Sequence, residues 1–173
     1  MAAAETFEAI ATYTTTGSQN TITFNSIPQT YTDLFVAIFS GNTTGSYYWT
    51  YIQVGNGSVD TGTNYFTTVN SANNSLYRSD RYTSATEFKI GGNDPNQKAT
   101  NYAFIQGYSK TNIWKPCLST LGFAGTGSNV GWAGYISNVW KSTSAINTIK
   151  ITLEAGQNFA NDSMYTLYGI KAA

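Results

Sequence analysis

Hydrophobic residues recur along this chain in short runs that alternate with polar residues. Alternate side chains of a β-strand point to the same face, so this spacing is typical of strands with one buried face. The segment Ile149-Lys150-Ile151-Thr152-Leu153-Glu154 alternates most cleanly and predicts a strand with its three apolar side chains inward. No stretch of about 11 residues has apolar positions at helical spacing. The pattern therefore predicts an all-β protein.

Turn-forming residues separate the predicted strands, as at Gly55-Asn56-Gly57 and in the predicted loop 91–96. Residues 34–39 are apolar on both faces, which predicts a central, well-covered strand. Pro116 is expected at a sheet edge or a bulge, because it cannot donate to a ladder. Many short strands between turns are typical of a sandwich or barrel. We expect a single antiparallel jelly-roll-like β-sandwich domain over residues 1–173. The predicted strands cover residues 7–14, 22–28, 34–39, 47–54, 65–69, 87–90, 102–108, 114–123, 131–140, 149–154 and 165–170.

Residues 70–84 are rich in Asn, Ser and Tyr and predict the longest surface loop. This segment carries both arginines of the chain, Arg78 and Arg81. Loops on a rigid scaffold are where contact surfaces usually lie. Residues 65–69, just before it, are interpreted as a short strand or a loop arm.

Charge is scarce, because charged residues make up 10% of the chain and the formal net charge is zero. Nine Lys and Arg residues spread along the sequence supply no basic patch for nucleic-acid phosphates. No apolar run approaches the roughly 20 residues of a membrane span, and no secretory leader is recognised. We therefore expect a soluble protein made in a cytoplasm, with neither nucleic acid nor membrane as its partner.

The sequence contains few of the residues that catalysis or metal binding would require. The chain has no histidine, which removes the usual base of nucleophilic pairs and the commonest metal ligand. Cys117 lies in an apolar strand and is expected to be a buried, inert thiol. Asp33 is expected to bond turn backbone, and the acids show no spacing typical of a glycosidase pair. Residues 60–65 lack the acids of a calcium loop and predict a turn held by Asp and Asn side chains. We expect no enzyme activity, no cofactor and no metal.

Aromatic residues make up 15% of the chain. Tyr47, Trp49 and Tyr51 fall on one face of a predicted strand, whose other face carries Tyr48 and Ile52. Such a stripe either forms core or stacks on sugar rings or a partner subunit. The candidate interface residues are Tyr47, Trp49, Tyr51, Arg78, Arg81, Trp132 and Trp140.

Four sequence blocks resemble a family of small all-β structural proteins from the virions of tailed bacteriophages. The blocks are Ile22–Leu34, which contains Ser-Ile-Pro-Gln-Thr-Tyr-Thr-Asp-Leu, then Trp140–Ile149, Asn158–Ser163 and the C-terminal run from Tyr165 with Thr-Leu-Tyr-Gly-Ile-Lys. The resemblance implies an antiparallel β-sandwich that sits on phage heads or tails. We expect the closing strand to pair inside a sheet, with Tyr165, Leu167 and Tyr168 largely buried.

The resemblance to these virion proteins implies that the chain has a structural function. We expect a capsid decoration or cement protein on the virion exterior, synthesised in the bacterial host cytoplasm. Its expected partners are the major capsid protein and itself, as a homotrimer. The short length, with no shaft ahead of the domain, favours this role over a tail fibre. The alternative is a tail-associated receptor-binding module that recognises host-surface polysaccharide, because Asn- and Ser-rich loops and aromatic stripes suit glycans as well.

Overall fold

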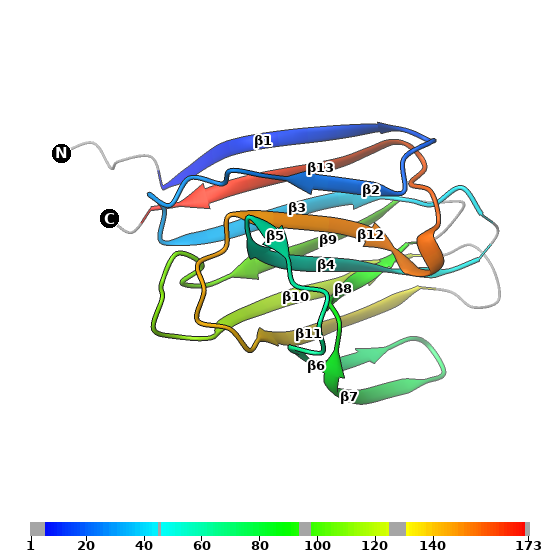
Figure 1. Ribbon diagram of the computed structural model, residues 1–173. Coiled ribbons are helices and arrows are strands. Elements are labelled where there is room, and N and C mark those ends of the chain that lie inside the picture. Colours follow the sequence, from blue (N-terminus) through cyan, green and yellow to red (C-terminus); the bar gives the residue numbers. More distant parts are fainter. Residues whose placement is uncertain (1–5, 45, 94–97, 125–130, 172–173) are drawn as a thin grey trace.

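The computed structural model describes residues 6–44, 46–93, 98–124 and 131–171. Within these residues, thirteen strands and one short 3-10 helix form two facing sheets (Figure 1). The elements are β1 (Phe7–Thr16), β2 (Thr21–Phe24), β3 (Asp33–Ser40), β4 (Tyr48–Asn56), β5 (Ser58–Val59), β6 (Tyr65–Ala72), β7 (Tyr77–Ala85), β8 (Phe88–Asn93), β9 (Ala99–Ile105), β10 (Lys115–Phe123), β11 (Trp132–Trp140), β12 (Thr148–Leu153), η1 (Glu154–Gly156) and β13 (Asn161–Ile170).

The larger sheet has eight strands in the order β1-β13-β3-β9-β10-β11-β6-β7. The smaller sheet has the order β2-β12-β4-β5, and β8 pairs with β4 beside β5. Every pairing is antiparallel. The predicted all-β antiparallel sandwich is confirmed, whereas its jelly-roll-like character stays a prediction.

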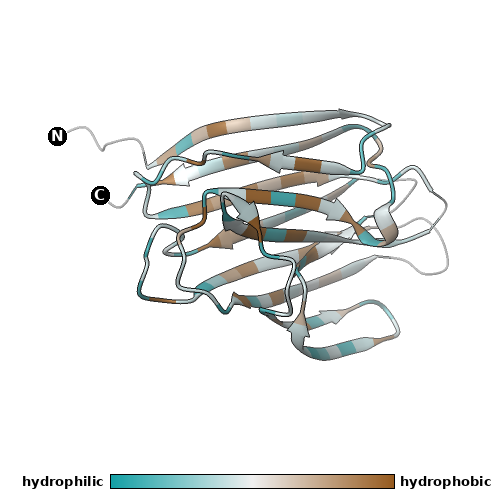
Figure 2. Cartoon of the chain, viewed as in Figure 1, coloured by the Kyte–Doolittle hydropathy of each residue, from teal (hydrophilic) through white to brown (hydrophobic). Residues whose placement is uncertain are grey.

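Hydrophobic and hydrophilic residues alternate along several strands (Figure 2), and buried hydrophobic side chains form the core between the sheets. In β12, the inward residues Ile149, Ile151 and Leu153 are buried, as predicted. In β13, Tyr165 and Leu167 are completely buried, and the strand pairs with β1 on one side and β3 on the other. Tyr168 is less buried than these two residues: it lies on the outer face of the sheet, because its neighbours in sequence take the inward positions.

Strand β3 is central in the larger sheet, between β13 and β9, as predicted. Only one of its faces is well covered, however. Leu34 and Val36 are fully buried toward the smaller sheet, whereas Phe39 is 43% exposed on the outer face. The apolar run therefore does not mark a strand covered on both sides. It marks a sheet whose outer face is apolar and open.

Residues 70–84 do not form the predicted loop. They continue β6, turn at residues 73–76 and return as β7, the last strand of the larger sheet. Asn73 holds this turn, because its side-chain oxygen accepts from the backbone N–H groups of Ser75 and Leu76 at 3.0 and 2.7 Å. Strand β7 is polar and pairs on one side only, which is why it resembles a loop in sequence.

Strand β8 ties the end of the smaller sheet onto the larger one. The carbonyl oxygen of Lys89 accepts from Asn138 Nδ2 of β11 at 3.0 Å and from Ser119 Oγ of β10 at 3.2 Å. These partly buried bonds anchor the backbone of β8 over β10 and β11. Residues 91–93 of the predicted loop 91–96 belong to β8 instead, and residues 94–96 lie outside the described residues.

Pro116 occupies neither an edge nor a bulge. It is the second residue of β10, an interior strand between β9 and β11. The register of β9 begins only at Cys117, opposite Ile105. A proline is tolerated here because its nitrogen lies beyond the end of the β9 ladder.

Candidate functional site

The two faces of β4 contribute to different apolar clusters. Ile52 and Val54 belong to the main core between the sheets. Trp49, on the opposite face, packs with Val69, Leu121 and Ile136 of the larger sheet in a second cluster. The far end of the larger sheet therefore wraps around the outside of β4 and β8. Half-buried aromatic residues surround this second cluster, namely Tyr47, Tyr51, Tyr82, Phe123 and Trp132.

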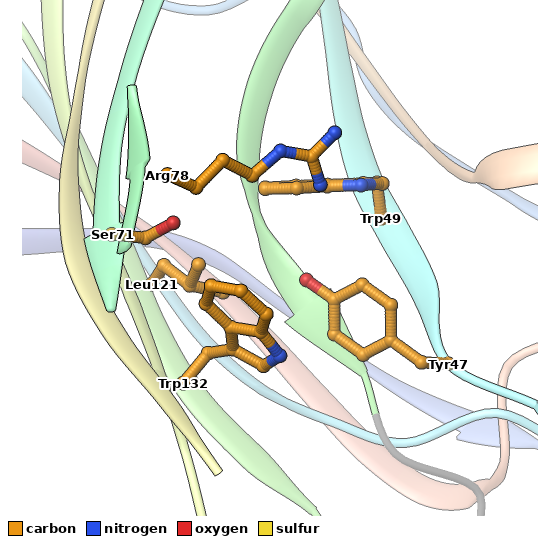
Figure 3. A pocket seen from close by; sticks show the side chains of 6 residues that line it. All are labelled: Tyr47, Trp49, Ser71, Arg78, Leu121 and Trp132. Carbon is orange, nitrogen blue, oxygen red and sulfur yellow. The ribbon is translucent and has the colours of Figure 1, made fainter. Parts of the chain in front are cut away.

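A cavity of about 120 Å³ lies within this second cluster (Figure 3). We refer to it as the aromatic cavity. Its lining residues come from five separate segments of the chain. They are Tyr47, Trp49, Ser71, Arg78, Leu121 and Trp132.

The floor of the aromatic cavity is one ladder across four strands. Leu121 of β10 lies opposite Gly134 of β11, Gly134 lies opposite Ser71 of β6, and Ser71 lies opposite Arg78 of β7. A Cβ atom at Gly134 would sit 2.3 Å from the backbone oxygen of Asn70. Glycine is thus required at this position, and with the small side chain of Ser71 it leaves space above the strands.

Aromatic rings form the walls and roof. Tyr47 stacks on Phe123 with ring centroids 5.1 Å apart and meets Trp49 edge-on at 5.8 Å. The Tyr47 ring also lies against Gly92 of β8, where any Cβ atom would approach it to 2.1 Å. Burial raises the pKa of the Tyr47 hydroxyl above its usual value, so it stays protonated and can donate a hydrogen bond. Trp132 closes the opposite side (Figure 3).

Three of the side chains that line the aromatic cavity carry a hydroxyl or guanidinium group. Ser71 is 3% exposed, and among the described residues its hydroxyl oxygen has no hydrogen-bond partner. In Figure 3 this hydroxyl points into the space between the rings, as does that of Tyr47. The third group is the guanidinium of Arg78, whose side chain is 44% exposed and whose Nε donates to Asp80 on the same strand. The pair makes the mouth of the cavity polar but close to neutral.

A second cationic side chain, that of Lys89, lies against the aromatic rings next to the cavity. Lys89 Nζ lies 4.7 Å from the Trp49 ring centroid, 4.8 Å from that of Tyr82 and 5.2 Å from that of Tyr51. It also donates to the Tyr51 hydroxyl at 3.4 Å. Burial lowers the pKa of Lys89. These rings therefore already bind a cation of the chain itself, a well-known cation–π arrangement.

The structure brings four of the seven candidate interface residues together. Tyr47, Trp49, Arg78 and Trp132 line the aromatic cavity, and Tyr51 lies beside it in contact with Lys89. The four aromatic residues are buried or half-buried and do not form an exposed stripe, whereas Arg78 is exposed.

Two of the candidates lie elsewhere. Arg81 is opposite Thr68 and three residues from Arg78, which places it on the other face of β7. Trp140 is 3% exposed in the main core, where its indole nitrogen donates to Asp60 at 2.8 Å. Ser71, Leu121 and Gly134 complete the site but have no distinctive signal in the sequence.

Asp60 organises the turn at residues 60–65, as predicted. Its carboxylate accepts from the backbone N–H of Gly62 at 2.8 Å and from Asn64 Nδ2 at 2.9 Å, besides the indole of Trp140. Burial disfavours the charged form, but these hydrogen bonds outweigh it and lower the pKa of Asp60. In the described part of the chain, no three His, Cys, Asp or Glu side chains gather as a metal site.

Asp33 also bonds turn backbone, since its carboxylate accepts from the N–H of Gly107 at 2.7 Å. Cys117 is buried, as predicted, and burial raises the pKa of its thiol. Its inertness stays a prediction.

A second surface is the outer face of the larger sheet. The register places Tyr168, Phe35, Phe104 and Leu118 in one row across β13, β3, β9 and β10. A hollow of about 280 Å³ lies on this face over β13, β3 and β9. On β1, β3, β10, β11 and β13, five large apolar side chains of this face are substantially exposed: Phe7 (53%), Phe39 (43%), Leu118 (47%), Tyr135 (63%) and Met164 (45%). We call this surface the outer face.

Comparison with protein-family models, curated proteins and solved structures gives no match for the chain. A search of the described residues finds no helix that is long and apolar enough to span a membrane.

Proposed function

We propose that this protein is a structural component of a tailed-bacteriophage virion, where it decorates the capsid exterior and stabilises the head. The observation that carries the proposal is the outer face, on which five large apolar side chains are 43–63% exposed. Contiguous exposed apolar surface is typical of docking sites on other proteins. The resemblance of four sequence blocks to those of phage virion proteins, and the low charge of the chain, support a role in a crowded shell.

In this proposal the outer face docks on the major capsid protein. The face belongs to an eight-stranded sheet, so it presents its side chains on a stiff platform. Burying the rings of Phe7, Phe39 and Tyr135 would remove apolar area from water, at roughly 25 cal/mol per Å². Each contact is modest, but many copies that bridge neighbouring capsid subunits raise the resistance of the whole particle to heat and internal DNA pressure.

The test starts with purified virions. Quantitative mass spectrometry should find hundreds of copies per particle, and particles lacking the protein should release DNA at a lower temperature. Adding the purified protein back should restore heat resistance. If such particles are as robust as the complete ones, the stabilising role is refuted.

Variants then locate the docking surface. Leu118→Asp places a charge in the middle of the outer face, where Leu118 is 47% exposed, and should abolish binding to particles that lack the protein. Trp114→Ser is the control, because Trp114 is 52% exposed and lies in the connection before β10, four residues from Leu118 and outside the strands of the sheet. Equal binding by both variants would show that another surface contacts the capsid.

We also propose that the protein associates with itself, as a homotrimer. A neutral chain with open apolar surface has little charge to keep copies apart. Light scattering should give three times the mass of the chain. A monomer both in solution and on the particle contradicts this proposal. If Leu118→Asp converts the oligomer to monomers without affecting capsid binding, the outer face joins copies of the chain instead.

A second candidate function is a tail-associated receptor-binding module for host-surface polysaccharide. One observation favours it, namely the aromatic cavity with its inward hydroxyl groups. A copy number of a few tens or fewer, with loss of adsorption but unchanged heat resistance when the protein is absent, would select this candidate over the decoration protein.

A further inference from the structure

The aromatic cavity combines two properties that packing alone does not require. It leaves about 120 Å³ open inside an otherwise dense cluster, and it buries a serine hydroxyl without a partner among the described residues. A buried hydroxyl without a hydrogen bond is costly, and most are satisfied by protein, water or ligand. Ser71 is therefore placed to bond something that enters the cavity.

The volume sets the size of the occupant. A protein cavity of about 150 Å³ holds one benzene-sized ring. At about 120 Å³ the aromatic cavity is somewhat smaller, so it takes one six-membered ring only if the ring substituents stay outside, at the mouth beside Arg78.

The lining sets the chemistry. Trp49, Tyr47 and Trp132 offer apolar ring surfaces, which suit the C–H face of a pyranose ring. Ser71 donates and accepts at the floor, and the protonated Tyr47 hydroxyl donates from the wall. Arg78 uses its Nε for Asp80 and keeps its other N–H donors for a ligand oxygen. A pyranose has this combination of an apolar face and a rim of hydroxyl groups.

The charged residues near the cavity favour a neutral sugar over a charged one. Arg78 at the mouth is already paired with Asp80, so an added carboxylate would have to compete with Asp80 for the guanidinium. A purely aromatic ligand would leave the Ser71 hydroxyl unpaired, which costs affinity. An ammonium ligand is also disfavoured, because Lys89 already occupies the adjoining aromatic faces of Trp49 and Tyr82.

We propose that the aromatic cavity binds one neutral pyranose ring of a saccharide, held between Trp49, Tyr47 and Trp132 and bonded through Ser71. The site does not depend on whether the protein sits on the head or the tail. On a capsid it would give the particle weak contact with surface glycans, and on a tail it would serve adsorption.

The experiment titrates the full-length protein with glucose, galactose, mannose and N-acetylglucosamine, and reads tryptophan fluorescence. Trp49 and Trp132 line the cavity and report on it, and a Trp114→Phe background removes an exposed tryptophan that does not. At least one sugar should give a saturable change with a Kd on the order of millimolar, the affinity expected of one small ring. Oligosaccharides and host polysaccharide of the same sugar then show whether the site reads a free ring or part of a chain.

Variants of Ser71 test the assignment. Ser71→Ala removes only the hydroxyl and should weaken binding about tenfold. Ser71→Val fills the floor of the cavity and should abolish binding. Ser137→Ala is the matched control, because Ser137 is an exposed serine of the same sheet whose side chain lies on the outer face. Both alanine variants should unfold cooperatively at similar denaturant concentrations, so that binding is compared between folded proteins.

Three results would overturn the inference. The first is that no neutral sugar binds, or that Ser71→Ala binds as well as the unchanged protein. The second is that glucuronate binds in preference to glucose and requires Arg78, which would make the site one for acidic ligands. The third is that indole or benzene binds more tightly than every sugar, which would make it a purely apolar cavity. None of these results bears on the virion proposal, which copy number and particle stability test separately.

Discussion

Replacing Leu167 by alanine tests the most strongly predicted part of the fold. Leu167 is completely buried in β13, opposite Ala11 of β1 and Val36 of β3. We expect Leu167→Ala to lower the free energy of unfolding by about 2–5 kcal/mol, the range measured when buried leucines are truncated to alanine.

Two contributions make up this range. Removing three buried carbon atoms forfeits about 0.8 kcal/mol each of transfer free energy, or about 2.4 kcal/mol together. The remainder depends on the cavity that is left, at about 24 cal/mol per Å³. Since β13 is paired on both sides, its backbone has little freedom to collapse into the space, so we expect a value in the upper half of the range.

The measurement is equilibrium unfolding in urea, followed by tryptophan fluorescence at several protein concentrations. Met164→Ala in the same strand is the control, because Met164 is 45% exposed on the outer face and should change stability by less than about 1 kcal/mol. The midpoint of Leu167→Ala should fall with an unchanged slope. The reasoning is refuted if Leu167→Ala costs less than about 1 kcal/mol, or if the two variants cost the same at every concentration.

Three further predictions concern other parts of the chain. Deleting residues 164–173 should leave the protein insoluble in a sedimentation assay, because β1 loses the strand that pairs with it and β3 loses one of its two neighbours; a soluble, cooperatively folding truncation would contradict this. Cys117, fully buried, should react with Ellman's reagent only after the protein unfolds, and rapid labelling of the native protein would show otherwise. The lowered pKa of Asp60 means that its ionised form stabilises the fold above the usual Asp pKa of about 4 and that this contribution is lost as pH falls through the folded-state value. Urea unfolding of Asp60→Asn should therefore show a stability loss at pH 7 that shrinks below about pH 4, and a loss independent of pH would disprove the coupling.

The buried strands could be predicted from the sequence because hydrophobic residues alternate with polar ones along them, and the hydrophobic side chains face the core. Strand β12 illustrates this, since Ile149 and Ile151 point inward and Lys150 between them does not. The same rule fails for β7, where inward and outward positions are both polar. Its inward positions carry Arg78 and Asp80 at the edge of a sheet, where no second strand adds burial. The turn held by Asn73 was therefore not distinguished from the rest of this polar segment in the sequence.

The aromatic cavity could be predicted only in part. Its rings were recognised as candidates because large aromatic residues are conspicuous in a sequence. The reason that Tyr47 and Trp132 meet is the wrapping of one sheet around the outside of β4, a long-range arrangement that local pattern does not encode. The space itself results from Gly134 and Ser71, two small residues that resemble many others in a chain with 16 glycines.

The outer face and the aromatic cavity lie on opposite faces of the same sheet, and this separation makes the two proposals independently testable. Leu118 points outward from β10, whereas Leu121, three residues later, points inward to the cavity. Substitutions at sites without shared contacts usually add in free energy. Leu118→Asp should therefore remove capsid attachment and leave sugar binding intact, and Ser71→Val should do the reverse. If either variant loses both properties while it remains folded, the two surfaces are coupled through the sheet, and a single interface would have to account for both.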